Sequence, residues 1–144
     1  MVYLKKYFLF SLILSLALFF TSCQDKIFTG TVNCDECYSP EPDSVQLILH
    51  ITLNNQFSSV PVVLYKGNID NGILIDTFDC NKDPVNDIWV KANSTYSAKA
   101  IYGCVNDTIM VVDGTKQQLK KVTGQCNSDC WVIEGNDLYL KLAF

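Results

Sequence analysis

The sequence has no arginine and a single histidine, His50, among its 144 residues. Its eleven lysines are outnumbered by fifteen aspartates and glutamates, which gives a formal net charge of −4. Nucleic acids and anionic lipid headgroups are bound by clustered cations. A chain with an excess of acids and no arginine is therefore a poor candidate for binding either of them.

The sequence also lacks a catalytic signature. His50 lies on the polar side of a predicted strand, and no serine or cysteine motif accompanies it that would form a nucleophile–base couple. No segment after residue 22 has a convincing helical period. We therefore expect a protein built of strands that is not an enzyme and has no cofactor or resident metal.

One long apolar run is present, at the N-terminus. Lys5 and Lys6 precede fourteen mostly apolar residues, 7–20. A helix that crosses a bilayer needs roughly 20 apolar residues, so this run is short for a permanent span. A basic flank, a short apolar run and small residues at its end are typical of a secretory signal peptide.

The run ends in Phe20-Thr21-Ser22-Cys23. This tetrapeptide resembles the lipobox of bacterial lipoproteins, with Phe20 where leucine is usual. The resemblance implies that a diacylglyceryl group is attached to the sulfur of Cys23 and that a peptidase cuts after Ser22. One acyl chain binds a membrane only marginally, so stable anchoring takes two or more chains.

The resemblance also divides the chain and suggests where it resides. We expect a signal peptide over 1–22, a lipidated N-terminus and tether over 23–43, and a β-sandwich over 44–144. Gln24 follows the cysteine, which by the sorting preferences of Gram-negative lipoproteins implies the outer membrane, with acylated Cys23 in membrane lipid. The partner would be an envelope protein or a glycan that the sequence does not identify.

With Cys23 set aside, six cysteines remain, an even number that indicates a disulfide framework in an exported protein. Cys80 and Cys104 each end a predicted strand, and neighbouring strand ends can bring two Cα atoms to the roughly 5.5 Å that a disulfide needs. We favour a bridge between these two cysteines.

The other four cysteines form two motifs, Cys34-x-x-Cys37 and Cys126-x-x-x-Cys130. Bridges between the motifs would staple the tether to the segment before the last strand. Four thiolates could alternatively hold zinc, and a CxxC pair could be redox-active. The oxidising exported setting favours structural disulfides.

From residue 44 onwards the pattern is that of short strands separated by turn residues. The segment 45–53 has one apolar side, and its other side carries Gln46, His50 and Thr52, which predicts a strand with one buried face. The residues of the apolar side are Val45, Leu47, Leu49, Ile51 and Leu53. Eight strands are expected in all, at 45–53, 60–66, 73–78, 88–92, 96–102, 108–113, 118–122 and 137–142. Seven to nine short strands favour a two-sheet, all-β sandwich.

Two segments carry a family resemblance. VPVVLYKG (60–67) and TYSAKAIYG (95–103) resemble strands of transthyretin-like or carboxypeptidase-regulatory-like domains, which are small Ig-like sandwiches. The resemblance implies an Ig-like fold and carries over no catalytic residue.

The aromatic residues Trp89, Trp131, Tyr139 and Phe144 are expected to pack in the core or on a sheet face. If several of them were exposed together, they could form a patch that stacks on carbohydrate or binds a protein.

Two short motifs, Asp43-Ser44-Val45 and Asp107-Thr108-Ile109, resemble O-glycosylation sites of some Gram-negative bacteria. The resemblance marks Ser44 and Thr108 as acceptor hydroxyls.

The anchoring hypothesis predicts the chemistry of the mature N-terminus. Mass spectrometry of the protein from a Gram-negative host should find a chain that begins at Cys23 and carries a diacylglyceryl thioether. A mature chain with an unmodified Cys23 thiol would contradict the prediction.

Overall fold

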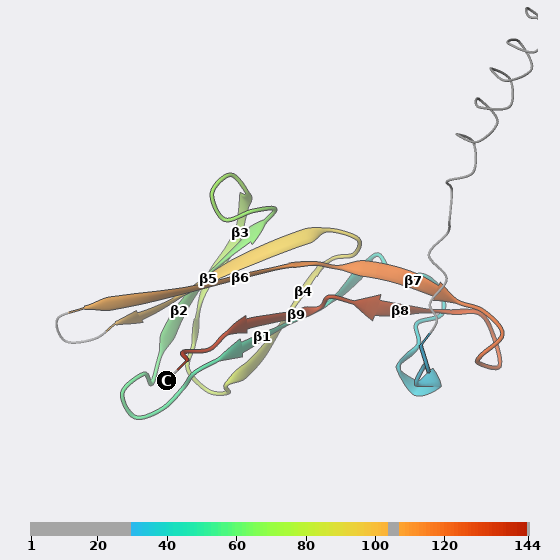
Figure 1. Cartoon of the computed structure of the whole chain (residues 1–144), viewed down its shortest axis with the longest axis horizontal. Helices are drawn as coiled ribbons and strands as arrows, with labels where there is room; N and C mark the ends of the chain where they lie inside the picture. The colour runs from blue at the N-terminus through green and yellow to red at the C-terminus, as the bar shows by residue number, and fades with distance from the viewer. Residues whose placement is uncertain (1–29, 104–106, 144) are drawn as a thin grey trace, which may run out of the picture.

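The structure, a computed structural model, describes residues 30–103 and 107–143, and it confirms the all-β, sandwich-like fold (Figure 1). A single turn of 3₁₀ helix, η1 (Cys34–Glu36), precedes the strands. The strands are β1 (Ser44–Ile51), β2 (Val60–Lys66), β3 (Ile73–Cys80), β4 (Val85–Lys91), β5 (Thr95–Gly103), β6 (Thr108–Lys116), β7 (Gln118–Val122), β8 (Cys130–Glu134) and β9 (Asp137–Leu140).

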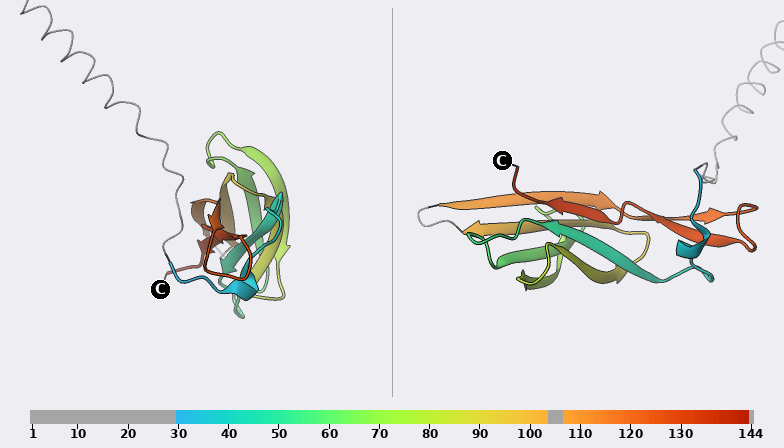
Figure 2. Two further views of the ribbon diagram at one scale, coloured as in Figure 1. Left: turned by 90° about the vertical axis from the view of Figure 1, so that its right-hand side faces the viewer. Right: turned by 90° about the horizontal axis from the view of Figure 1, so that it is seen from below.

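Two sheets form the sandwich and a third extends it. One sheet has the order β4-β1-β9, in which β1 is antiparallel to β4 and parallel to β9. The other has the order β3-β2-β5-β6 and is antiparallel throughout. The hairpin β7–β8 prolongs β6 and β9 beyond the sandwich, so that the molecule is elongated (Figures 1 and 2).

The core lies between the two sheets and follows from the alternation in β1. Val45, Leu47, Leu49 and Ile51 are buried, as the sequence predicts. They meet alternate residues of β2 and β5 from the opposite sheet and Leu138 and Leu140 of β9. The remaining members of β1 point away from the core, because successive side chains of a strand point to opposite sides.

Two buried tyrosines of β5 connect the sheets across this core. The Tyr102 hydroxyl donates to the carbonyl of Leu140 at 2.6 Å and accepts from the N–H of Thr52 at 3.0 Å. The Tyr96 hydroxyl donates to the carbonyl of Lys91 at 2.7 Å. Each hydroxyl thereby pairs with backbone groups of the opposite side of the sandwich, where an unpaired polar group would be costly.

Asn71-Gly72 is a dipeptide that predicts a hairpin turn, and the structure has this turn between β2 and β3. The N–H of Gly72 donates to the carbonyl of Asn68 at 2.6 Å. A Cβ atom on Gly72 would lie 2.4 Å from that carbonyl oxygen, so the turn requires glycine at this position.

The structure differs from the sequence-based strands in one whole strand and in some strand ends: β4 begins at Val85, not 88, and β6 ends at Lys116, not 113. It contains β8, which the sequence analysis missed, because only Cys130 of this strand is buried and the strand is held by pairing with β7. In the sequence, Pro61 indicates an edge strand or a strand start; β2 lies inside its sheet, and Pro61 is the second residue of the strand. The ladder to β5 begins at Val62, so the absent N–H of Pro61 costs that ladder nothing.

The Tyr102 hydroxyl gives a stability prediction. Tyr102→Phe leaves the Thr52 N–H and the Leu140 carbonyl without this partner and should lower the free energy of unfolding by about 1–3 kcal/mol. Urea denaturation measures the change. Tyr139→Phe, at an exposed tyrosine, is the control and should change stability by less than about 0.5 kcal/mol. Equal effects of the two substitutions would contradict the role of Tyr102.

Candidate functional site

Two disulfides join the tether to the β7–β8 hairpin, and we call this pair of bridges the clamp. Cys34 is bonded to Cys126 and Cys37 to Cys130, so the bridges run between the two cysteine motifs. Beside them, Tyr38 and Trp131 exchange two backbone hydrogen bonds of 2.9 Å. Figure 2 shows this N-terminal segment lying against the end of the hairpin. Any pull on the tether is therefore passed to the hairpin by two covalent links.

Three sulfur atoms of the clamp lie close together. The Sγ atoms of Cys37, Cys126 and Cys130 all lie within 4.8 Å of one another. Cys37 and Cys126 are half-buried and Cys130 is buried. In reduced form these side chains would present a cluster of thiols, the arrangement that a zinc site uses.

Cys80 does not form the bridge that we favoured from the sequence. It is a free thiol, 1% exposed, and its Cα partner on β2 is Val60. Because β2 lies between β3 and β5, the ends of these two strands are about 10 Å apart, too far for a disulfide. Burial, assisted by the charge of Asp79, raises the pKa of Cys80 to about 11. Cys104 lies outside the described residues.

The outer side of the β4-β1-β9 sheet is the strongest candidate for a binding site. We call it the His50 face. It consists of outward-pointing side chains of the three strands: Gln46, Ile48 and His50 of β1, Val85, Asp87 and Trp89 of β4, and Asp137 and Tyr139 of β9. Ser44 and Lys91, opposite each other, continue the same side beyond Gln46 and Trp89.

The strand register arranges the His50 face in rows. Gln46 is opposite Trp89 in the first row. Ile48 lies between Asp87 and Asp137 in the second, and His50 between Val85 and Tyr139 in the third. The two aromatic residues thus occupy opposite corners, with carboxylates and amide groups between them.

Hydrogen bonds fix the polar side chains of this face. The Gln46 amide donates to Asp87 Oδ2 at 2.9 Å, and His50 Nε2 lies 2.7 Å from Asp137 Oδ1. The His50 ring stacks on Tyr139, with ring centroids 4.5 Å apart and planes 5° from parallel. Each hydrogen bond joins two different strands, so the groups are positioned before any ligand arrives.

Of the two expected places, the core or a sheet face, Trp89 and Tyr139 occupy a sheet face, where both are exposed. Trp89 is 61% exposed and Tyr139 is 60% exposed. Trp131 is half-buried beside the disulfide clamp, and Phe144 lies outside the described residues. Trp89 and Tyr139 are thus two exposed aromatic residues on one sheet face, at its opposite corners.

His50 is less free than a solvent-facing strand residue would be. Its side chain is 19% exposed, and its contacts are the carboxylate of Asp137 and the ring of Tyr139. A nucleophile–base couple needs a serine, threonine or cysteine at the imidazole. The neighbours of His50 across its two ladders are Val85 and Tyr139, neither of which is one of these residues. The hydrogen bond with Asp137 holds the imidazole ring in place.

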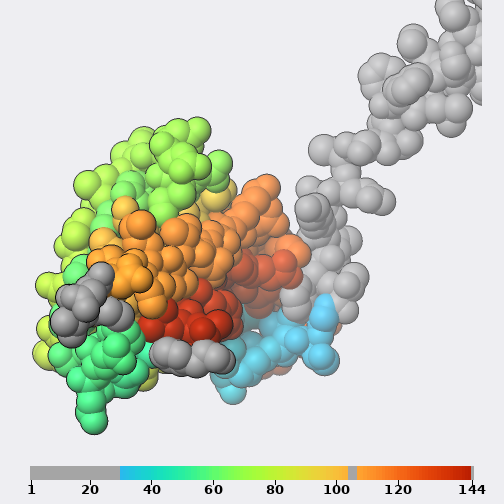
Figure 3. Space-filling view, turned by 60° about the vertical axis from the view of Figure 1, so that its left-hand side comes forward, coloured from blue at the N-terminus to red at the C-terminus, as the bar shows by residue number. Residues whose placement is uncertain are grey.

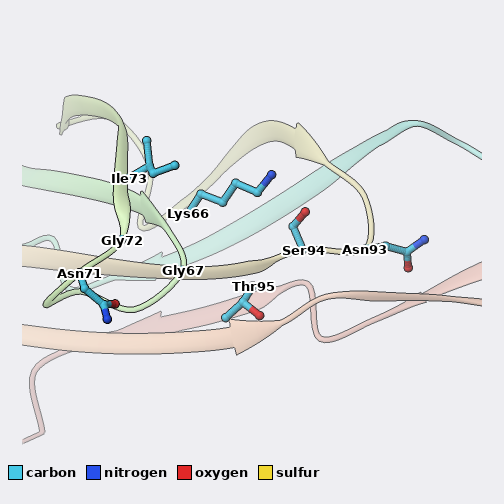
Figure 4. A pocket seen from close by; sticks show the side chains of 8 residues that line it. All are labelled: Lys66, Gly67, Asn71, Gly72, Ile73, Asn93, Ser94 and Thr95. Atoms are coloured by element: carbon cyan, nitrogen blue, oxygen red, sulfur yellow. The ribbon is translucent and has the colours of Figure 1, made fainter.

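A hollow of about 520 Å³ lies elsewhere, where the β2–β3 turn meets the start of β5 (Figure 4). Lys66, Asn71 and Thr95 are among its lining residues. Two other polar side chains of its lining serve the local backbone. Asn93 accepts from the N–H of Leu119, and Ser94 donates to the carbonyl of Ala92. The lining residues of the hollow include no aromatic side chain, in contrast to the His50 face.

The second sheet also exposes apolar side chains, on its two outermost strands. On β3 they are Ile73, Leu74 and Ile75, and on β6 they are Ile109, Met110 and Val112. The β2 and β5 strands separate the two groups. The β6 strand lies beside β9 (Figure 3), where Asp113 accepts from the N–H of Tyr139. These aliphatic groups lack the organised polar partners of the His50 face.

Other residues singled out from the sequence are distributed as follows. Ser44 and Thr108 are exposed, each as the first residue of its strand. Ser44 is opposite Lys91, at the end of the sheet that carries the His50 face. Cys23 and its lipobox lie outside the described residues.

No family model, curated protein or solved structure matches the chain. Within residues 30–103 and 107–143, no helix is long and apolar enough to cross a membrane.

The cysteine arrangement predicts an alkylation pattern. Without reductant at pH 8, Cys80 should resist iodoacetamide in the folded protein, because the thiol is buried and its pKa is about 11. In guanidinium it should react, while the four bridged cysteines react only after reduction. Peptide mapping by mass spectrometry measures both steps. Recovery of a peptide in which Cys80 is disulfide-bonded to Cys104 would contradict the arrangement.

Proposed function

We propose that this protein is a lipoprotein of the bacterial outer membrane, anchored through Cys23, that binds an envelope ligand on its His50 face without catalysing a reaction. The observation that carries the proposal is the pair of exposed aromatic residues, Trp89 and Tyr139, at the corners of a face whose polar groups are already hydrogen-bonded in place.

The clamp supports the anchoring part of the proposal. Cys34 follows Cys23 by eleven residues, which span at most about 40 Å when fully extended. Two disulfides then join this short tether to the β7–β8 hairpin. An anchored protein would thus be held by its hairpin end, with the sandwich carried beyond it.

The exposed aromatic residues support the binding part. A single exposed apolar residue is ordinary on a protein surface, but several on one organised face mark an interaction site. Tryptophan and tyrosine are enriched in binding sites because each combines a large apolar ring with a polar group. The arrangement of the His50 face is therefore that of a recognition surface.

The thiol cluster supports a second candidate, an accessory thiol-redox or metal-binding role for Cys34, Cys37, Cys126 and Cys130. The specific observation is the 4.8 Å grouping of three of these sulfurs. Its test is the metal content of the protein as purified from cells. One equivalent of zinc with four metal-protected thiols would replace the structural account of the clamp, whereas a metal-free, disulfide-bonded protein would retain it.

Photo-crosslinking in cells tests binding at the His50 face. The full chain, with p-benzoylphenylalanine in place of Trp89, should form an adduct with its ligand on irradiation, because this group reacts with C–H bonds of proteins and glycans alike. The matched control places the same residue at Met110, which is also 61% exposed but lies on the other sheet. Mass shifts on denaturing gels, followed by glycan staining and peptide sequencing, identify what is attached.

The proposal predicts adducts from position 89 and none from position 110. Adducts from position 110 alone, or from neither position, would contradict binding at the His50 face.

A further inference from the structure

We propose that the ligand of the His50 face is a neutral oligosaccharide that lies across the sheet from Trp89 to Tyr139. This inference rests on the proposed function and specifies the chemistry of its ligand. It follows from the order in which aromatic, polar and charged groups occur across the face.

The aromatic residues supply two stacking surfaces. One side of a sugar ring presents C–H groups, which pack on an aromatic ring, while the hydroxyls point outward around its rim. Trp89 and Tyr139 are each about 60% exposed. One face of the Tyr139 ring stacks on His50, which Asp137 holds in turn, so the ring is fixed and its other face remains for a ligand. A ring fixed in this way loses little conformational entropy when a ligand binds.

The groups between the aromatic residues accept hydrogen bonds from hydroxyls. An ionised carboxylate has about four lone-pair positions. Gln46 occupies one position on Asp87, and His50 occupies one on Asp137. Most of the acceptor capacity of both carboxylates therefore remains for a ligand. Sugar hydroxyls, each of which carries a donor hydrogen, fit this requirement.

The charge of the face argues against an ordinary protein interface, an anionic ligand and a single metal ion. The centre of the face is the row Asp87–Ile48–Asp137, with two carboxylates. Protein interfaces are depleted of charge at their centre and place it at the rim, which is the reverse order. An anionic ligand would be repelled by both carboxylates at the centre, and Lys91, on the same side of β4, lies beyond Trp89 at the end of the sheet. The two aspartates are about 10 Å apart across β1, too far to share one metal ion.

The spacing of the aromatic residues indicates a ligand of several sugar rings. Trp89 and Tyr139 belong to rows four residues apart along β1, about 13 Å, and to strands two positions apart, about 10 Å. The diagonal is therefore roughly 16 Å. No single sugar ring reaches both side chains, so a chain of several rings is needed to use the whole face.

Affinity electrophoresis of the mature, disulfide-bonded protein tests the inference. The probes are neutral polysaccharides cast into native gels, namely a β-glucan, an α-mannan and a xylan, with polygalacturonate as the anionic comparison. We expect at least one neutral polysaccharide to retard the protein and polygalacturonate to leave its migration unchanged. Trp89→Ala and Tyr139→Ala should each weaken the retardation roughly tenfold, as loss of an aromatic contact at a binding centre does.

Two further variants separate loss of contact from loss of fold. Trp89→Phe keeps an aromatic ring and should retain most of the retardation. Tyr65→Ala removes a half-buried tyrosine from the outer side of the other sheet and should have no effect on it. Absence of retardation in every neutral gel, retardation that persists in both alanine variants, or stronger retardation by polygalacturonate would overturn the inference.

The crosslinking experiment distinguishes this failure from failure of the proposed function. A protein adduct at position 89, together with no retardation by neutral polysaccharides, would refute the oligosaccharide and leave the binding face in place. No adduct at position 89 would refute the binding face itself.

Discussion

The alternation of side chains along β1 is the constraint on which the rest of the structure depends. This strand lies in the middle of its sheet, so its inward residues, from Val45 to Ile51, form one wall of the core. Its outward residues, from Gln46 to His50, form the middle of the candidate site. A shift of one residue would exchange the two sets, and the cost of exposing four buried aliphatic side chains prevents it. The same hydrophobic burial that stabilises the sandwich therefore also positions the face.

In this account the clamp serves attachment, and the sandwich carries the face that binds the ligand. At one end the disulfides fasten the tether to the β7–β8 hairpin, which packs Leu119 and Ile133 against the core. The sandwich itself is held by its apolar core and by the hydroxyls of Tyr96 and Tyr102. Because the clamp and the His50 face involve different residues, the means of attachment and the means of recognition can be altered independently.

Local patterns predicted the parts of the structure that depend on neighbours in the chain. The alternation in β1, the Asn71-Gly72 turn and the all-β fold class are of this kind. The pairing of β1 with β4 on one side and β9 on the other depends on topology, so the sequence could not place Trp89 and Tyr139 on one face. The same limit explains the bridge wrongly favoured for Cys80, because β2 lies between the strands concerned.

The indole N–H signals of the two tryptophans offer the most direct measurement of the central claim. Trp89 lies on the His50 face, whereas Trp131 lies beside the disulfide clamp and serves as an internal control. Oligosaccharides prepared from a neutral polysaccharide that retards the protein can be added to it in steps while ¹H–¹⁵N NMR spectra are recorded. The account predicts that the Trp89 signal shifts in a saturable manner and the Trp131 signal stays in place. A shift of Trp131 alone, or of neither signal, would contradict it.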